Sequence, residues 1–284
     1  MTSNENIDPV WRERLAAGGL TSLRDLLAND ACALAGQVET LGKPGLGGRE
    51  RFRWRLGNGD DDTVLFVKRY RHTPVAQQLD RIRRQNAAHS RAWWEYRQSQ
   101  ALTRARIGVA RAVGFAEEMT GALERRSIVL LERVPGDAFD RAWTRARDEK
   151  SPCTHGRARH DVTMRLACFV AAFHATGNCH RDLYLCHVFV ELDPAATRPP
   201  TFSLIDLART HRPRWRRTRW LVKDLAQLDC SARQIGATRT DRLRFLRAYL
   251  SNRPDRTRLR VLSKRVARKS DRILERIERK SQCE

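Results

Sequence analysis

Long apolar runs are missing from this chain of 284 residues. The longest, Ser127–Leu131 and Cys168–Phe173, are far shorter than the roughly 20 residues that a membrane-spanning helix needs. Residues 1–8 contain neither a basic leader nor an apolar stretch, so a secretory signal is not expected. These absences predict a cytoplasmic, soluble protein.

The cysteines of the chain show no pairing pattern. The seven cysteines are scattered and none forms a CxxC pair, which suits a reducing compartment better than a disulfide framework. One cluster, Cys179-His180 with Cys186-His187, resembles a zinc-binding pair. No second ligand pair lies at finger-like spacing, so zinc is the weaker interpretation of these histidines.

Acidic residues are outnumbered, with 33 Asp and Glu against 55 Lys and Arg and a net charge of +22. Such an excess predicts a polyanionic partner, which the charge alone leaves open as nucleic acid, an anionic membrane face or a phosphorylated substrate. Hydrophobic residues make up 41% of the chain, so it is not a disordered basic tail.

The first part of the chain changes character near residue 36. Residues 1–35 are predicted to be helical, because Asp8-Pro9 provides a cap followed by proline. Residues 38–69 are predicted to form strands, since Phe52, Trp54 and Leu56 alternate with arginines. A hairpin loop at 57–62, a helix over 75–102 and strands at 109–115 and 127–133 complete this part.

The second part is predicted to be mainly helical, beginning near Pro135. An amphipathic helix is expected over 161–176, where apolar residues recur at helical spacing. A polar, charged loop is expected over 145–159, a strand at 202–205, and helices from Leu221 onwards. The predicted domains are an N-terminal helical extension (1–35), a strand-rich lobe (36–134) and a helical lobe with a basic C-terminus (135–284).

Four residues with side chains suited to catalysis occur in a characteristic order along the chain. Lys68 ends an apolar strand, Glu95 lies in the following helix, Asp182 lies in the segment His180–Val190, and Asp206 follows an apolar run. In this order the residues resemble the protein-kinase signature set. Phosphoryl transfer needs such groups, because a lysine aimed by a glutamate grips phosphate, one carboxylate holds magnesium and another orients the attacking hydroxyl.

Several details depart from protein kinases. His187 stands where those enzymes carry Asn, and the glycine turn around Gly45 and Gly47 is not GxGxxG. The segment from His180 to Val190, with its Cys-His pair, instead closely resembles the catalytic loop of the bacterial lipopolysaccharide core heptose kinase family. The chain is also similar to that family around Asp206 and at 219–226, and the resemblance extends over about residues 34–279.

The resemblance implies an α+β, protein-kinase-like bilobal fold, with a small antiparallel-sheet N-lobe and a mainly helical C-lobe. It implies ATP and Mg²⁺ as cofactors and a heptose hydroxyl of the lipopolysaccharide inner core as acceptor. The implied roles are, in turn, catalysis by Asp182; nucleotide binding by Lys68, Glu95, Gly45 and Gly47; and metal binding by Asp206 and His187. The resemblance also suggests that Asp224 braces the catalytic loop.

Two basic stretches are consistent with such an acceptor. Seven cations and no acid occur from 209 to 223, and twelve cations against four acids occur from 253 to 280. They are expected to bind phosphates and acidic sugars at an anionic leaflet, with Trp215 and Trp220 contacting sugar rings. Peripheral attachment to the inner membrane is expected, and no nucleic-acid partner.

Three alternatives remain at this point. One is a kinase for another acceptor, such as Kdo, an antibiotic or a protein. A basic nucleic-acid-binding protein is the second, although it leaves the ordered set of Lys68, Glu95, Asp182 and Asp206 unexplained. The third is a non-catalytic pseudokinase, which the presence of all four residues disfavours.

Overall fold

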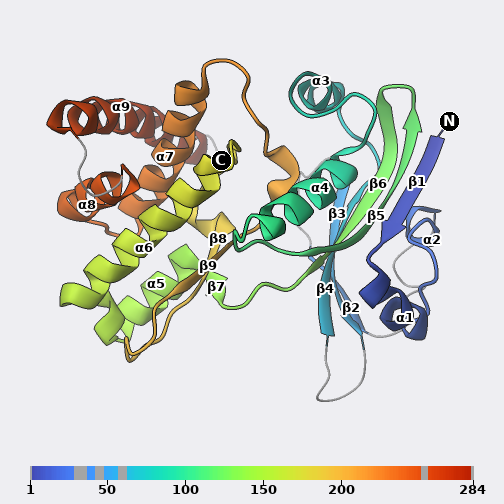
Figure 1. Cartoon of the computed structure of the whole chain (residues 1–284), viewed down its shortest axis with the longest axis horizontal. Helices are drawn as coiled ribbons and strands as arrows, with labels where there is room; N and C mark the ends of the chain where they lie inside the picture. The colour runs from blue at the N-terminus through green and yellow to red at the C-terminus, as the bar shows by residue number, and fades with distance from the viewer. Residues whose placement is uncertain (1, 29–36, 42–47, 57–62, 251–254, 283–284) are drawn as a thin grey trace. The chain divides into compact units, whose positions relative to one another are not determined.

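The computed structural model describes residues 2–28, 37–41, 48–56, 63–250 and 255–282 (Figure 1). The chain divides into two compact units. The first unit draws on residues 1–104, 109–134 and 207–210, and the second on residues 105–108, 135–206 and 211–284. Within the described residues, no helix combines the length and the apolar character needed to span a bilayer.

A six-stranded antiparallel sheet forms the centre of the first unit, in the order β1-β5-β6-β4-β3-β2. The alternation of apolar residues predicts β3 correctly, because Phe52, Trp54 and Leu56 are buried and Trp54 lies opposite Leu65 of β4. The hairpin loop predicted at 57–62 lies outside the described residues. The strands are β1 Thr2–Ile7, β2 Gln37–Thr40, β3 Arg49–Leu56, β4 Thr63–Tyr70, β5 Ala112–Thr120 and β6 Leu123–Glu132.

The prediction of helix from the first residue is wrong for Thr2–Ile7, which form strand β1. This strand is polar and mostly exposed, so no apolar alternation marks it; it forms because the edge of β5 offers backbone groups for pairing. The capped helix begins after it, as α1 (Pro9–Ala17), with the Asp8 side chain accepting from the Val10 N–H. With the short α2 (Asp25–Ala28), it covers one face of the sheet through buried residues such as Leu15.

The helix predicted over 75–102 is two helices, α3 (Val75–Arg84) and α4 (Arg91–Arg104). Buried Arg81 draws the intervening turn onto itself, because its guanidinium donates to the carbonyls of Asn86 and His89. Ser90 then starts α4 by accepting the Trp93 N–H at 3.1 Å. The break matters for the site because α4 carries Glu95.

The described residues of the second unit form five α-helices and a small three-stranded sheet. Helix α6 packs against α8, and α7 packs against α9. The charged loop predicted over 145–159 is wrong at both ends, since Phe139, Ala142 and Ala146 bury one face of α5 and α6 already begins at residue 156. The elements are α5 Phe139–Asp148, α6 Gly156–Ala175, α7 Arg217–Gln234, α8 Arg239–Tyr249, α9 Arg256–Ser281, and strands β7 Asp137–Ala138, β8 Val188–Glu191 and β9 Thr201–Leu204.

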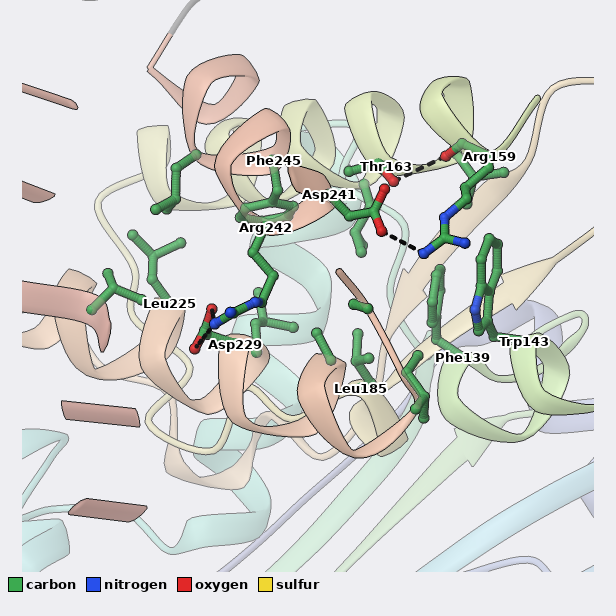
Figure 2. Close-up of a pocket in the computed structure, with 18 residues that line it drawn as sticks. Phe139, Trp143, Arg159, Thr163, Leu185, Leu225, Asp229, Asp241, Arg242 and Phe245 are labelled. Carbon is green, nitrogen blue, oxygen red and sulfur yellow. Dashed lines mark hydrogen bonds and ion pairs between the residues drawn. The ribbon is translucent and has the colours of Figure 1, made fainter. Parts of the chain in front are cut away.

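An apolar cavity of about 80 Å³ lies among the helices of this unit (Figure 2). Its lining includes Phe139 of α5, Leu225 of α7 and Phe245 of α8. Leu185 reaches it from the segment that precedes β8 and is 2% exposed. The segment that carries Asp182 is therefore anchored from one side by apolar packing.

Candidate functional site

Lys68 and Glu95 form an ion pair in the first unit, with 2.7 Å between Nζ and Oε1. Leu65 and Val67 of β4 face the core under α1 and α2, so the alternation of the strand directs Lys68 to the face that α4 covers. The Lys68 side chain is 12% exposed and that of Glu95 1%. A lysine held in this way presents its ammonium group at a fixed position, which suits the binding of a phosphate.

Glu95 also orders a second segment of the first unit. Its Oε1 accepts the Leu207 N–H at 3.1 Å. Gln85 Nε2 and Trp94 Nε1 donate to the Thr210 carbonyl at 3.1 and 2.7 Å, which holds the other end of 207–210. One carboxylate thus binds Lys68 and fixes the residue that directly follows Asp206 in the chain.

In the second unit, one face of α7 holds the loop that contains Asp182. Asp224, at 0% exposure, accepts the N–H groups of His180 and Arg181 at 2.7 and 2.8 Å. Gln227 Oε1 accepts the Leu183 N–H at 3.2 Å, and Ser231 Oγ accepts the Leu185 N–H at 3.1 Å. These three acceptors are spaced i, i+3 and i+7, so one helix face fixes the backbone on both sides of Asp182.

The charges beneath the loop are buried and matched. Burial by itself would raise the pKa of Asp224, but the hydrogen bond and charge of His174, and the His180 N–H, hold this pKa below its usual range. Burial lowers the pKa of His180, as does the neighbouring His187. His180 Nε2 faces the Ile205 carbonyl at 3.0 Å, so it carries the proton of a neutral ring and donates. The loop therefore rests on an ionised carboxylate and a neutral imidazole, so His180 has a structural role.

Two site residues adopt positive φ angles, 72° at Arg181 and 60° at Asp206. A non-glycine residue in this region costs of order 1–3 kcal/mol and persists where its surroundings enforce it. At Arg181 the enforcing contacts are the Asp224 carboxylate on its N–H and Lys223 Nζ on its carbonyl. The backbone is thus strained directly before Asp182 and at Asp206 itself, as is common at functional sites.

His187 is hydrogen-bonded to the backbone of the loop that contains Asp182. Its Nδ1 donates to the Asp182 carbonyl at 2.7 Å, and its ring stacks on that of His180 with 6.0 Å between centroids. Burial opposes protonation, but hydrogen bonding and charge from Cys186, the Asp182 carbonyl and the charge of Asp206 together raise the pKa of His187 to about 9. The side chain of His187 therefore fixes the backbone of the loop at Asp182.

The chemistry of the donors fits magnesium better than zinc. Within the described residues, no three His, Cys, Asp or Glu side chains converge as metal ligands. Cys179 is buried, which raises the pKa of its thiol to about 12, and its backbone pairs with that of His211. Magnesium needs few protein ligands, because phosphates and water complete its shell, and the half-buried Asp206 carries a carboxylate, the type of ligand that magnesium prefers.

The basic segment after Asp206 is mostly exposed. Arg212 and Arg214 project from the surface, and Trp215 is 83% exposed. Trp220 is instead half-buried, with the Arg181 guanidinium 5.7 Å from its ring centre and His211 against its edge. Trp215 is free to meet a sugar ring, whereas Trp220 supports the loop.

Part of the site is predictable from the sequence. The pairing of Lys68 with Glu95 and the bracing of the loop by Asp224 are present, whereas Gly45 and Gly47 lie outside the described residues. Gln227, Ser231 and His174 are not among the predicted residues. The signal for the first two was a polar residue three and seven positions after Asp224 on an otherwise apolar helix face.

The chain is similar to known proteins of one kinase family. A model of the lipopolysaccharide kinase (Kdo/WaaP) family matches residues 50–249. The chain is 33% identical over 193 residues to the lipopolysaccharide core heptose(I) kinase WaaP of Pseudomonas aeruginosa, covering 65% of this chain and 69% of that protein. It is 30% identical over 179 residues to the WaaP of Escherichia coli K12, covering 61% and 66%.

A solved structure agrees over nearly the whole chain. WaaP in complex with acyl carrier protein superposes with a TM-score of 0.67 at 26% identity, covering 96% of this chain and 99% of that one. The expected α+β, protein-kinase-like fold is confirmed by this match.

Proposed function

Because the chain belongs to the lipopolysaccharide kinase (Kdo/WaaP) family and is a kinase, we propose that it transfers the γ-phosphate of ATP to a heptose hydroxyl of the lipopolysaccharide inner core. One observation carries the proposal: the loop of Asp182 is fixed by four backbone hydrogen bonds to a single face of α7. Such a fixed carboxylate suits the orientation of an acceptor hydroxyl.

Asp182 is assigned to the acceptor. Its carboxylate accepts the proton of the attacking hydroxyl as that oxygen bonds to the γ-phosphorus, and the bond from this phosphorus to the ADP oxygen breaks. Lys68, aimed by Glu95, donates hydrogen bonds to phosphate oxygens of the nucleotide and offsets their charge. We assign nucleotide binding to the 36–134 lobe, including Gly45 and Gly47, and the acceptor to the 135–284 lobe.

Asp206 is assigned to magnesium. A bound Mg²⁺ neutralises charge on the phosphates and orients them for transfer. His187 stays the second predicted ligand, since its Nδ1 donates to the Asp182 carbonyl and Nε2 is the ring nitrogen that would bind the ion. The contact of His187 with the Asp182 carbonyl supports a role in positioning the loop.

The acceptor and partners follow from the relatives' names. The two relatives named above are heptose(I) kinases, so heptose is the first candidate acceptor; the family name also includes Kdo, which makes its hydroxyl the second. Arg212, Arg214 and Trp215 are exposed and suited to an anionic sugar. We place the enzyme at the cytoplasmic face of the inner membrane, attached peripherally, with an acyl carrier protein as a partner, as in the solved relative.

The test is transfer of radiolabelled phosphate from ATP with magnesium. The acceptors are lipopolysaccharide core without heptose phosphate and a truncated core that ends in Kdo. Asp182→Ala is the inactive variant, and Asp148→Asn, an exposed carboxylate of α5, is the control for loss of one charge. Label on the heptose core with wild type and the control, and none with Asp182→Ala, is expected. If the Kdo-terminated core is labelled as efficiently as the heptose core, Kdo is the acceptor. ATP hydrolysis without label on either core refutes both acceptors.

A further inference from the structure

Helix α9 of the second unit presents an unusual concentration of exposed cations. It contains 26 residues, and its contacts with α7 and α8 leave one long face open. Val266 and Ser270 are buried on the packed side. The exposed cations of the helix are Arg256, Arg258, Arg260, Lys264, Arg265, Arg268, Arg272, Arg276 and Arg279.

Five of these arginines form a row, the arginine ridge, defined as Arg258, Arg265, Arg268, Arg272 and Arg276. Three of its members are spaced seven residues apart, which is close to two helical turns, so their side chains leave the same face. At 3.6 residues per turn, all five fall within an arc of about 80°, and at 1.5 Å per residue the ridge is roughly 27 Å long. The ridge is therefore a straight cationic strip rather than a scattered charge.

Ion pairs within the described residues do not balance the positive charge of the arginine ridge. No ridge arginine makes an ion pair with a carboxylate in the part of the chain that the structure describes. Two acids of α9 pair with arginines outside the ridge, Asp271 with Arg233 of α7 at 2.7 Å and Glu275 with Arg279 at 3.7 Å. Like charges three or four residues apart, as along the ridge, oppose helix formation, so an external polyanion would stabilise α9.

We propose that the arginine ridge binds the anionic headgroups of a lipid bilayer and docks the enzyme on the membrane. This inference rests on the proposed function, since a glycolipid acceptor is presented at such a surface. A straight strip on a convex helix face suits a plane of charges, and arginine binds phosphate through two hydrogen bonds. Helix α9 contains no aromatic residue to stack on bases, whereas Val261, 45% exposed, lies within the same arc and suits an interface with lipid.

The test is sedimentation of the full chain with vesicles of phosphatidylglycerol and cardiolipin, or of phosphatidylcholine alone. The ridge variant is R265Q/R268Q/R272Q/R276Q. The matched control is R12Q/R83Q/R104Q/R125Q, which removes the same charge from exposed arginines of the first unit. Both variants are also assayed for phosphate transfer to a soluble, deacylated core and for binding to acyl carrier protein.

Wild type and control are expected to bind anionic vesicles and not phosphatidylcholine, with binding that weakens as salt rises. At about fivefold per arginine, the four substitutions of the ridge variant should weaken binding to anionic vesicles about 600-fold, whereas the control variant should bind them as wild type does. The proposal is overturned if the two variants lose vesicle binding equally, or if the ridge variant keeps vesicle binding and loses only acyl carrier protein. Absence of transfer in every protein contradicts the proposed function and leaves the vesicle result to decide the ridge.

Discussion

Replacing Asp224 by Asn tests how the site is held together. The wild-type carboxylate is fully buried and uses both oxygens, Oδ1 for the Arg181 N–H and Oδ2 for the His180 N–H and His174. Asn has the same size but offers one oxygen and one NH₂ group. In either orientation of the amide, one backbone N–H of the loop faces another donor, and the negative charge beneath the loop is lost.

The expected cost follows from these contacts. A buried donor left unpaired costs about 1–3 kcal/mol, and each hydrogen bond to a charged group contributes about 1.5–3 kcal/mol. We therefore expect Asp224→Asn to lower the free energy of unfolding by about 3–5 kcal/mol, a large part of the 5–15 kcal/mol typical of a folded domain. The loop should shift as its bonds lengthen, and a displacement near 1 Å costs about 100-fold in rate.

The assay measures urea unfolding together with kcat and the KM for ATP at a temperature where the variant stays folded. We expect kcat to fall about 100-fold with a KM for ATP close to wild type, because the loop that Asp224 holds carries Asp182, the residue assigned to the acceptor. Asp229→Asn is the control, since Asp229 lies on the same helix but pairs with Arg233 and Arg242. A variant Asp224→Asn with kcat within threefold of wild type and unchanged stability would refute the proposed bracing of the loop.

Four further predictions use other parts of the structure. Lys68→Met should lower kcat/KM for ATP by about 10²–10³, as for loss of one preorganised donor. It should also lower the free energy of unfolding in urea by about 3 kcal/mol, because the buried Glu95 loses the charge that balances it; equal kinetics would remove Lys68 from the site. Glu95→Gln should lower kcat/KM for ATP less, by about tenfold, because the amide oxygen still accepts a hydrogen bond from Lys68. A larger loss of kcat/KM than in Lys68→Met would contradict this ranking. Ser231→Ala leaves the Leu185 N–H unpaired and should lower the free energy of unfolding by about 1–3 kcal/mol in urea titrations, whereas no change would show that the contact is dispensable. Burial raises the pKa of Cys179 and of Tyr249 to about 12, so folding stability is highest below the ordinary thiol pKa near 8.5 and should fall as pH rises towards 12; a flat melting temperature over that range would contradict it.

Sequence reasoning succeeded where local pattern decides structure. The alternation in β3 and the apolar run of β4 predicted their strands, and the cap at Asp8 identified the start of α1. Lys68, Glu95, Asp182 and Asp206 were predicted as site residues from their order along the chain, and the structure pairs the first two. The fold followed from the resemblance that these residues carry.

The errors arise where distant contacts decide. Strand β1 has no apolar alternation, and its pairing with β5 joins residues more than a hundred positions apart. The break between α3 and α4 depends on Arg81, whose guanidinium also donates to the distant Ala122 carbonyl, which no local propensity reveals. Gln227 and Ser231 look like ordinary polar positions of a helix until the loop is placed against them.

The position of the new phosphate on the product tests the central claim most directly. Core lipopolysaccharide without heptose phosphate is incubated with the enzyme, ATP and magnesium, and the product is examined by phosphorus NMR correlated to the sugar protons. The account predicts one new phosphate ester on a heptose carbon, which is absent when Asp182→Ala replaces the wild type. A phosphate on another sugar, or a heptose phosphate formed equally well by the variant, would contradict it.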